Sequence, residues 1–154
     1  MVERLIGGLL AGLSLTVPVL AQNLSAAPSY GDVSLSAGFT PDPYVVSLRA
    51  GGSVDASTTI HVGCPGFIAE APDFDLYYNA GSLPLIITAE ADADTTLIVN
   101  APDGEWYCDD DGGPGVNPQL RFAQPWTGTY SIWVGFYGQS STYPAELKIS
   151  ELDR

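Results

Sequence analysis

The densest group of side chains with ligand chemistry in this sequence is a run of three carboxylates, Asp109, Asp110 and Asp111. An aromatic pair and a cysteine precede the run, two glycines follow it, and no basic residue adjoins it. Neighbouring carboxylates repel one another, whereas Ca²⁺ binds about six to eight oxygen ligands. The run is therefore either a solvated turn or part of a cage for a hard cation.

Further oxygen ligands stand before and after the acidic run. On a strand, Asp92 and Asp94 would face the same side. They can meet the acidic run only if the edge of the sandwich between the two groups turns back toward them. The EF-hand pattern is absent, because Leu97 occupies the position that requires glycine. The sequence predicts a calcium site, with solvated loop carboxylates as the alternative. Its expected ligands are Asp94, Asp109 and Asp111, joined by Asp92, Asp110 and Asn117.

Nucleophilic catalysis lacks its usual residues in this chain. His61 is the one histidine, and the β-branched run around it predicts a position in the middle of a strand. No G-x-S-x-G elbow is present. The acidic residues are numerous enough for a glycosidase pair, but a general acid needs apolar surroundings and these residues stand in turn sequences. We predict that the chain is not an enzyme, with a secreted hydrolase as the least favoured alternative.

Several aromatic side chains suit either a binding surface or a core. Trp126, between Pro125 and a Thr-Gly turn, is predicted to be exposed, and Tyr137 joins it as a possible ligand-binding aromatic. Trp106 and Trp133 are expected in the core, because a buried tryptophan beside a disulfide is common in sandwiches.

The charge balance restricts the possible partners. The 154 residues include 18 acidic and 5 basic ones, which gives a net charge of −13. Nucleic acid binding is excluded because it requires a basic footprint, and anionic membranes are disfavoured for the same reason. The acidity is compatible with solubility, with cations or with basic partners.

The N-terminus resembles an export signal. Residues 1–21 combine a short charged start, an apolar run and a cleavage position after Ala21, which predicts a signal peptide, with a retained anchor as the alternative. We expect a secreted or periplasmic chain with no membrane span after processing. Two cysteines, Cys64 and Cys108, then predict one disulfide rather than free thiols or soft-metal ligands.

Residues 32–154 are expected to form one domain after a flexible lead at 22–31. Short runs of β-type residues alternate with turn signals, and no mature segment has a helical period. This pattern predicts an all-β fold, an antiparallel β-sandwich with jelly-roll character. The expected strands lie at 44–49, 58–62, 74–78, 85–88, 95–99, 105–108, 119–122, 130–137 and 145–150.

The stretch from Pro72 to Ser150 resembles the bacterial pre-peptidase C-terminal domain. The features that carry the resemblance are an Asp-x-Asp-x-aromatic strand at 73–77, a strand from Asp94 to a Pro-Asp-Gly turn at 102–104, the acidic loop at 109–111, and a Gly-Thr-Tyr strand from Gly128. The resemblance implies a jelly-roll-like sandwich with a secreted, non-catalytic accessory role. Some members of that family bind calcium, and some bind collagen or other polymers.

Together these observations predict an exported, non-catalytic binding or adhesion module that calcium stabilises. The expected partner is an extracellular polymer or protein whose identity the sequence leaves open. A self-assembling envelope or matrix subunit is the alternative, because the domain stands alone and carries many aromatic residues.

Overall fold

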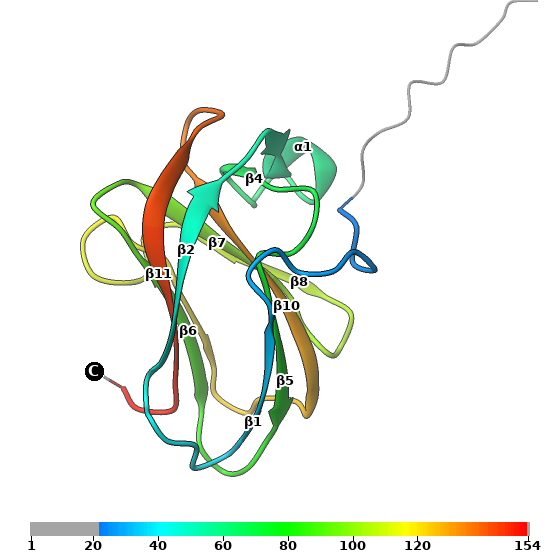
Figure 1. Ribbon diagram of the computed structural model, residues 1–154, viewed down its shortest axis with the longest axis vertical. Coiled ribbons are helices and arrows are strands. Elements are labelled where there is room, and N and C mark those ends of the chain that lie inside the picture. The colour runs from blue at the N-terminus through cyan, green and yellow to red at the C-terminus, as the bar shows by residue number, and fades with distance from the viewer. Residues whose placement is uncertain (1–21, 154) are drawn as a thin grey trace, which may run out of the picture.

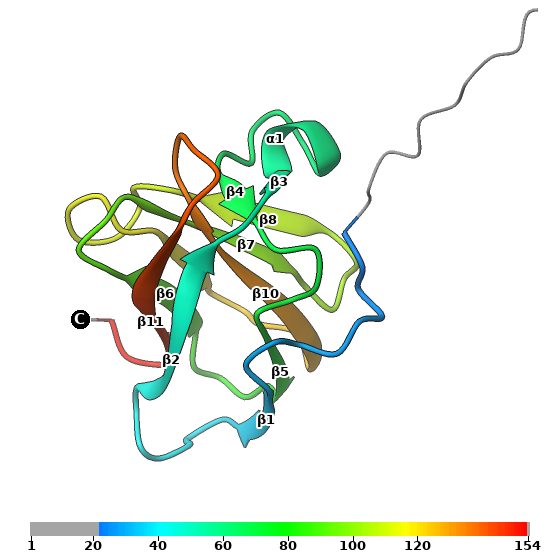
Figure 2. The ribbon, with the colours of Figure 1, turned by 45° about the horizontal axis from the view of Figure 1, so that its top comes forward.

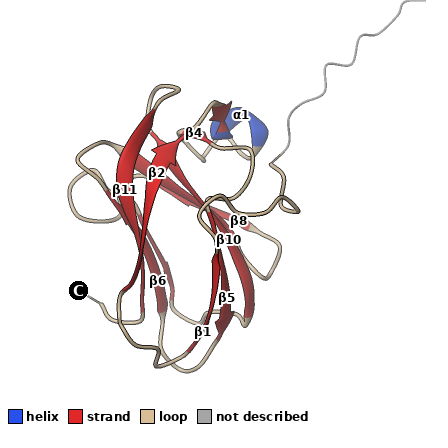
Figure 3. Ribbon diagram, in the orientation of Figure 1, coloured by secondary structure: helices blue, strands red, loops and turns tan. Residues whose placement is uncertain are grey.

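The computed structural model describes residues 22–153, so the predicted signal peptide lies outside the described residues. The described chain forms two β-sheets that pack face to face, with one short helix (Figures 1 and 3). A disulfide joins Cys64 to Cys108. The predicted all-β sandwich with one disulfide is therefore confirmed.

The larger sheet, sheet A, has seven strands and the smaller one, sheet B, has four. Sheet A runs β1–β5–β10–β4–β3, with β7 and then β8 paired on the other side of β10, and sheet B runs β2–β11–β6–β9. Sheet A contains β1 (Asp32–Ser36), β3 (Val54–Asp55), β4 (Phe67–Ile68), β5 (Phe74–Asn79), β7 (Thr95–Asn100), β8 (Trp106–Asp109) and β10 (Gly128–Phe136). Sheet B contains β2 (Tyr44–Gly51), β6 (Leu85–Glu90), β9 (Gln119–Phe122) and β11 (Thr142–Ser150).

Alternating apolar residues on the two sheets form the main core. Because successive strand residues point to opposite faces, every second residue of β6 and β11 enters the interior. The interior includes Leu85 and Ile87 of β6, Leu147 and Ile149 of β11, and Ile132 of β10, and these side chains have no exposed surface. The intervening residues of β6 and β11 are thereby directed to the outer face of sheet B.

Strand β10 has a gap on one side, and a buried aspartate fills it. Residues 128–132 pair with β5, and Phe136 pairs with Phe67 of β4. The chain between Phe67 and Phe74 is too long to stay in register with residues 133–135, so it bulges out of the ladder. The Val134 amide, which faces this gap, donates instead to the Asp73 carboxylate over 2.8 Å. Asp73 is 2% exposed, and desolvation raises its pKa to about 7, an increase that the Val134 hydrogen bond limits.

Near the disulfide, the short strands β3 and β4 of sheet A and helix α1 (Ala56–Thr59) between them form a small cap. The cap lies beside β7 and β8 in Figure 2. The cap and the sheet share a second, smaller core around Trp133, which is fully buried, and the ring centroids of Trp106 and Trp133 are 5.3 Å apart. The core position predicted for Trp133 is thus confirmed. The disulfide closes a loop of 44 residues here, which contributes roughly 4 kcal/mol in the chain-entropy model.

The strand predicted at 58–62 is wrong, because Thr58 and Thr59 are the last two residues of helix α1 and residues 60–62 form a loop. The Asp55 carboxylate accepts the Ser57 amide at 3.0 Å, and the Thr58 and Thr59 hydroxyls donate to the Asp55 carbonyl. These local hydrogen bonds at a helix N-cap prevail over the β propensity of threonine. His61 is consequently an exposed loop residue, whose Nδ1 accepts the Gly63 amide.

One pairing differs from the antiparallel pattern expected. Strand β1 runs parallel to β5, with Asp32 beside Asp75, whereas every other strand pairing recorded for the described residues is antiparallel. The lead before β1 contains no helix or strand. Its Asn23, Ser29 and Tyr30 amides donate to carbonyls of residues 70, 72 and 73, so the lead lies against the chain segment that bulges from β10.

We expect Asp73→Asn to change how the free energy of unfolding depends on pH. The folded-state pKa of Asp73 is about 7 and its ordinary value is 3.8, so between these values the folded chain keeps a proton that the unfolded chain has released. This retained proton stabilises the folded chain, and the stabilisation is fully present below about pH 4. The free energy of unfolding falls by on the order of 4 kcal/mol as the pH rises from there to about 7. Urea denaturation of both chains across this range measures the effect.

Asparagine keeps an acceptor for the Val134 amide but does not titrate. The variant should therefore gain stability relative to the wild type as the pH rises, while the control Ser34→Asn, at an exposed position on β1, should keep the pH profile of the wild type. Parallel pH profiles for wild type and Asp73→Asn would contradict the assignment.

Candidate functional site

The outer face of sheet B carries two adjoining depressions, of about 580 Å³ and about 220 Å³, which both include Glu90 in their walls. We call them together the sheet B groove. The larger depression lies between β2, β11 and the loop after β6, and it is lined by Ser47, Leu48, Glu90, Ala91, Asp92, Asn117, Pro144, Ala145 and Glu146. The smaller one extends toward Pro43 and Leu152 and includes Lys148.

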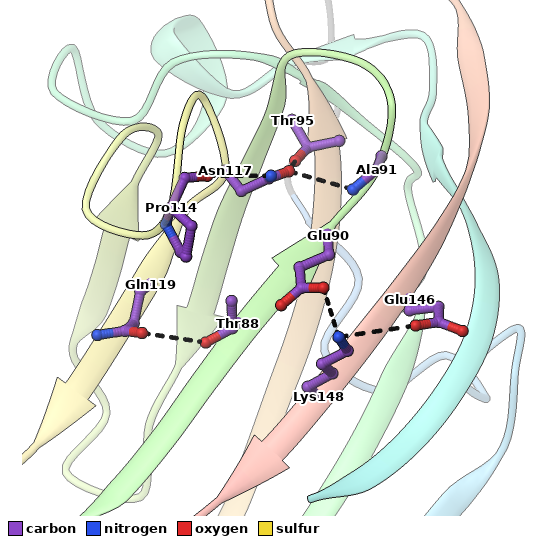
Figure 4. Close-up of polar contacts among 9 residues, drawn as sticks. All are labelled: Thr88, Glu90, Ala91, Thr95, Pro114, Asn117, Gln119, Glu146 and Lys148. Atoms are coloured by element: carbon purple, nitrogen blue, oxygen red, sulfur yellow. Dashed lines mark hydrogen bonds and ion pairs between the residues drawn. The ribbon is translucent and has the colours of Figure 1, made fainter. Parts of the chain in front are cut away.

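Strand alternation and register place the charged side chains of the groove. Glu146 of β11 stands directly opposite Glu90 of β6, and Lys148 stands opposite Thr88. Directly opposed like charges destabilise a sheet. The Lys148 ammonium relieves this repulsion, because it pairs with the Glu90 carboxylate and lies 3.8 Å from that of Glu146 (Figure 4). Lys148 lines only the smaller depression, Glu146 lines only the larger one, and Glu90 lines both.

Asn117 joins the two loops at the upper end of the groove. Its Oδ1 accepts the Ala91 amide at 3.1 Å and the Thr95 hydroxyl at 3.5 Å, and its Nδ2 donates to the Pro114 carbonyl at 3.1 Å (Figure 4). Below it, the Thr88 hydroxyl donates to the Gln119 side chain. The position predicted as a calcium ligand thus holds the loop after β6 against the acidic loop.

The acidic loop is organised by the first of its three aspartates. One oxygen of Asp109 accepts the Gly112 amide at 2.7 Å and the Gln119 amide at 2.8 Å. Partial burial raises the pKa of Asp94, and the negative charges of Asp111 and Asp110 raise it further. The hairpin of β7 and β8, which places Asp109 opposite Leu97, brings the acidic loop to the end of β7 that Asp94 precedes.

The predicted calcium ligands do not form one closed cage. Asp92 and Asp94 lie in the loop between β6 and β7 rather than on a strand, and Asp92 lines the groove instead of the acidic loop. Within residues 22–153, no group of three or more His, Cys, Asp or Glu side chains is arranged to hold a metal ion. Of the predicted ligands, Asp110 and Asp111 act on Asp94 through their negative charge.

The two aromatic residues proposed for ligand binding belong to different places. Trp126 is 42% exposed and packs with Tyr107 and Phe122, at ring separations of 6.3 Å each. Tyr137 is 47% exposed and follows the other end of β10, a strand of nine residues that spans about 30 Å. Both are exposed as expected, but they do not share a site.

Sequence reasoning missed the central residues of the groove. Glu90, Glu146 and Lys148 occupy alternate outward positions of two strands, a pattern that also describes an ordinary solvated sheet face. What distinguishes them is the cross-strand register, which opposes two carboxylates and which the sequence of either strand alone does not reveal.

Comparisons with known proteins add little to this geometry. No protein-family model and no curated protein sequence matches the chain. Among solved structures, the chain has a remote likeness to a periplasmic inhibitor of g-type lysozyme from Aeromonas hydrophila, with 16% identity, a TM-score of 0.37, and coverage of 78% of this chain and 96% of that one. A likeness this remote supports no inference.

No helix within residues 22–153 is both long and apolar enough to cross a membrane.

We expect Lys148→Met to lower the free energy of unfolding by about 1 kcal/mol, because it leaves Glu90 opposed to Glu146 without an intervening cation. Adding Glu146→Gln should restore most of the loss, since it removes one of the opposed charges. Urea denaturation of the two single variants and the double variant measures this coupling. If the two substitutions were simply additive, the like-charge repulsion would not be the cause.

Proposed function

We propose that this chain is an exported, non-catalytic binding module that holds a segment of an extracellular protein or polymer in the sheet B groove. The observation that carries the proposal is the groove itself, whose two depressions meet at Glu90 and whose larger depression is lined by the opposed carboxylates of Glu90 and Glu146. Binding sites are typically concave surfaces with a few convergent polar groups. The disulfide supports export, because such bonds persist in oxidising compartments.

The groove carboxylates support binding rather than hydrolysis. The side chains of Glu90 and Glu146 are 42% and 54% exposed, whereas a carboxyl group that acts as a general acid relies on apolar surroundings. The one strongly perturbed carboxyl group among the described residues is that of Asp73, which is enclosed by the sandwich and bound to a backbone amide. Its raised pKa therefore belongs to the fold.

Self-assembly is the second candidate function. Strand β2 is an edge of sheet B and pairs only with β11, and its Val45 is 44% exposed. An uncovered edge strand is a template for pairing with another chain. The net charge of −13 opposes association of identical copies, which is why the binding module is our first choice.

Calcium stabilisation is part of the proposal, and its support is electrostatic. Asp94 lies in the field of Asp110 and Asp111, and a divalent cation that drew these carboxylates together would remove their mutual repulsion. The pre-peptidase resemblance points the same way. In thermal melts we expect calcium to raise the midpoint relative to EGTA, by the equivalent of about 2.7 kcal/mol at a hundredfold excess over Kd.

The control for the calcium experiment is Asp94→Asn, which should lose most of the gain while folding normally. Magnesium should have a smaller effect, because it demands a stricter geometry and retains its water. An identical midpoint in calcium and in EGTA would remove calcium from the proposal without affecting the groove.

A tryptophan placed in the groove tests the binding function. Ser47 is exposed on β2 and lines the larger depression, so Ser47→Trp should fill that space without disturbing the core. The wild type and Ser47→Trp are compared on immobilised extracellular polysaccharides and exported proteins. Each ligand that the wild type binds should bind Ser47→Trp at least about tenfold more weakly, which corresponds to 1.4 kcal/mol.

The matched control is Ser34→Trp, at an exposed position on β1 in the other sheet. It should retain wild-type binding. The proposal would be refuted if the two tryptophan variants behaved alike for every ligand that the wild type binds.

A further inference from the structure

We propose that the occupant of the sheet B groove is a basic, extended segment of a partner protein, with a lysine or arginine side chain seated in the larger depression beside Glu90, Glu146 and Asp92. This inference rests on the proposed function and specifies the chemistry of its ligand. The observations that carry it are the arrangement of charges in the groove, the position of Lys148, and the apolar surfaces around the carboxylates.

The charge of the larger depression is one-sided. Three carboxylates line it, those of Glu90, Asp92 and Glu146, and none of its described lining residues is basic. The pairing of β6 with β11 holds Glu90 and Glu146 directly opposite each other, an arrangement that costs stability in a sheet. Lys148 supplies one positive charge near these two carboxylates, and a cation that enters the larger depression would supply a second one beside Glu90, Glu146 and Asp92.

Lys148 provides an example of this recognition within the chain itself. Its ammonium group reaches Glu90 and approaches Glu146 from β11, and its side chain is 26% exposed (Figure 4). The same two carboxylates are thus shown to accept a lysine on one side. The side that faces the larger depression offers the same pair together with Asp92.

The remaining surfaces suit the stem of a basic side chain. Pro144, which is exposed, and Ala91, which is half-buried, contribute apolar surface to the larger depression, whereas its Leu48 and Ala145 are buried in the main core. Lysine and arginine cover apolar surface with their aliphatic stems while their charged ends remain at polar groups. A single metal ion would use the carboxylates but not these surfaces, which favours a side chain as the occupant.

The surroundings of the groove extend its negative field. Asp94 and the acidic loop lie beyond its upper end, joined to it through Asn117, and the whole chain carries a net charge of −13. Such a field attracts basic partners and suppresses acidic ones. Because the two depressions meet at Glu90, a segment long enough to follow both is needed to fill the groove.

A labelled peptide of about eight residues that alternates lysine and serine tests the inference, because alternate residues of an extended chain point to one side. Fluorescence anisotropy should show binding that weakens as salt increases, since charge pairs at a surface are screened. The matched peptide with glutamate in place of lysine should not bind. Asp92→Asn and Glu146→Gln should each weaken binding by about three- to tenfold.

The charge-matched control is Glu105→Gln, at the turn between β7 and β8 and away from the groove, which should bind as the wild type does. Ser47→Trp should abolish binding of the peptide. Equal effects of Glu105→Gln and Asp92→Asn would show that attraction to the net charge alone explains the binding, and this would overturn the inference.

A different result would separate this inference from the proposed function. Ser47→Trp could prevent a ligand from binding while salt, Asp92→Asn and Glu146→Gln leave its affinity unchanged. This result would show that the groove binds an uncharged partner. The binding module would then stand and the basic segment would not. Peptide binding that survives Ser47→Trp would overturn the inference, while the proposed function would still be decided by the ligands that the wild type binds.

Discussion

The continuity of β10 through the centre of sheet A is the constraint on which the rest of the fold depends. This strand pairs with β7 on one side and with two separate strands, β5 and β4, on the other. The chain leaves the ladder between those two strands, and the Asp73 carboxylate supplies the acceptor that the missing backbone would have provided. A buried amide without a partner is costly. The aspartate therefore allows the chain to leave the sheet after β4 and to return in register at β5.

The groove on sheet B reflects a conflict between stability and ligand chemistry. Strand register opposes Glu90 and Glu146, and the sheet tolerates the pair because Lys148 lies diagonally between them. Sites that break a local rule without an evident structural gain are often functional. The core beneath them follows the rules closely, since Leu147 and Ile149 are fully buried by the same alternation that exposes the carboxylates.

Much of the fold was predictable from the sequence because period-two alternation and turn residues are local signals. The strands expected at 74–78, 85–88 and 95–99 are confirmed as β5, β6 and β7, each slightly longer than expected, and the expected disulfide is confirmed. The segment at 58–62 failed because the side-chain hydrogen bonds around Asp55 outweigh the β propensity of its threonines.

The site was less predictable, because it depends on which residues face each other across strands. Asp94 was expected near the acidic loop, and the hairpin of β7 and β8 brings them together. The groove needed the pairing of β6 with β11, two strands that are distant in sequence. Asn117 was expected as a ligand, but its amide is occupied in joining two loops.

The cap over part of sheet A gives the two outer faces of the sandwich different freedom to change. The disulfide and the packing around Trp133 tie the outer face of sheet A to the cap, so substitutions there disturb a second core. Outward residues of sheet B, such as Ser47 and Glu146, contact no such layer. Over evolutionary time this face can therefore acquire new side chains while the interior keeps its pattern. Descendants of this chain would then share the pattern of buried apolar residues and differ in the ligands that they bind.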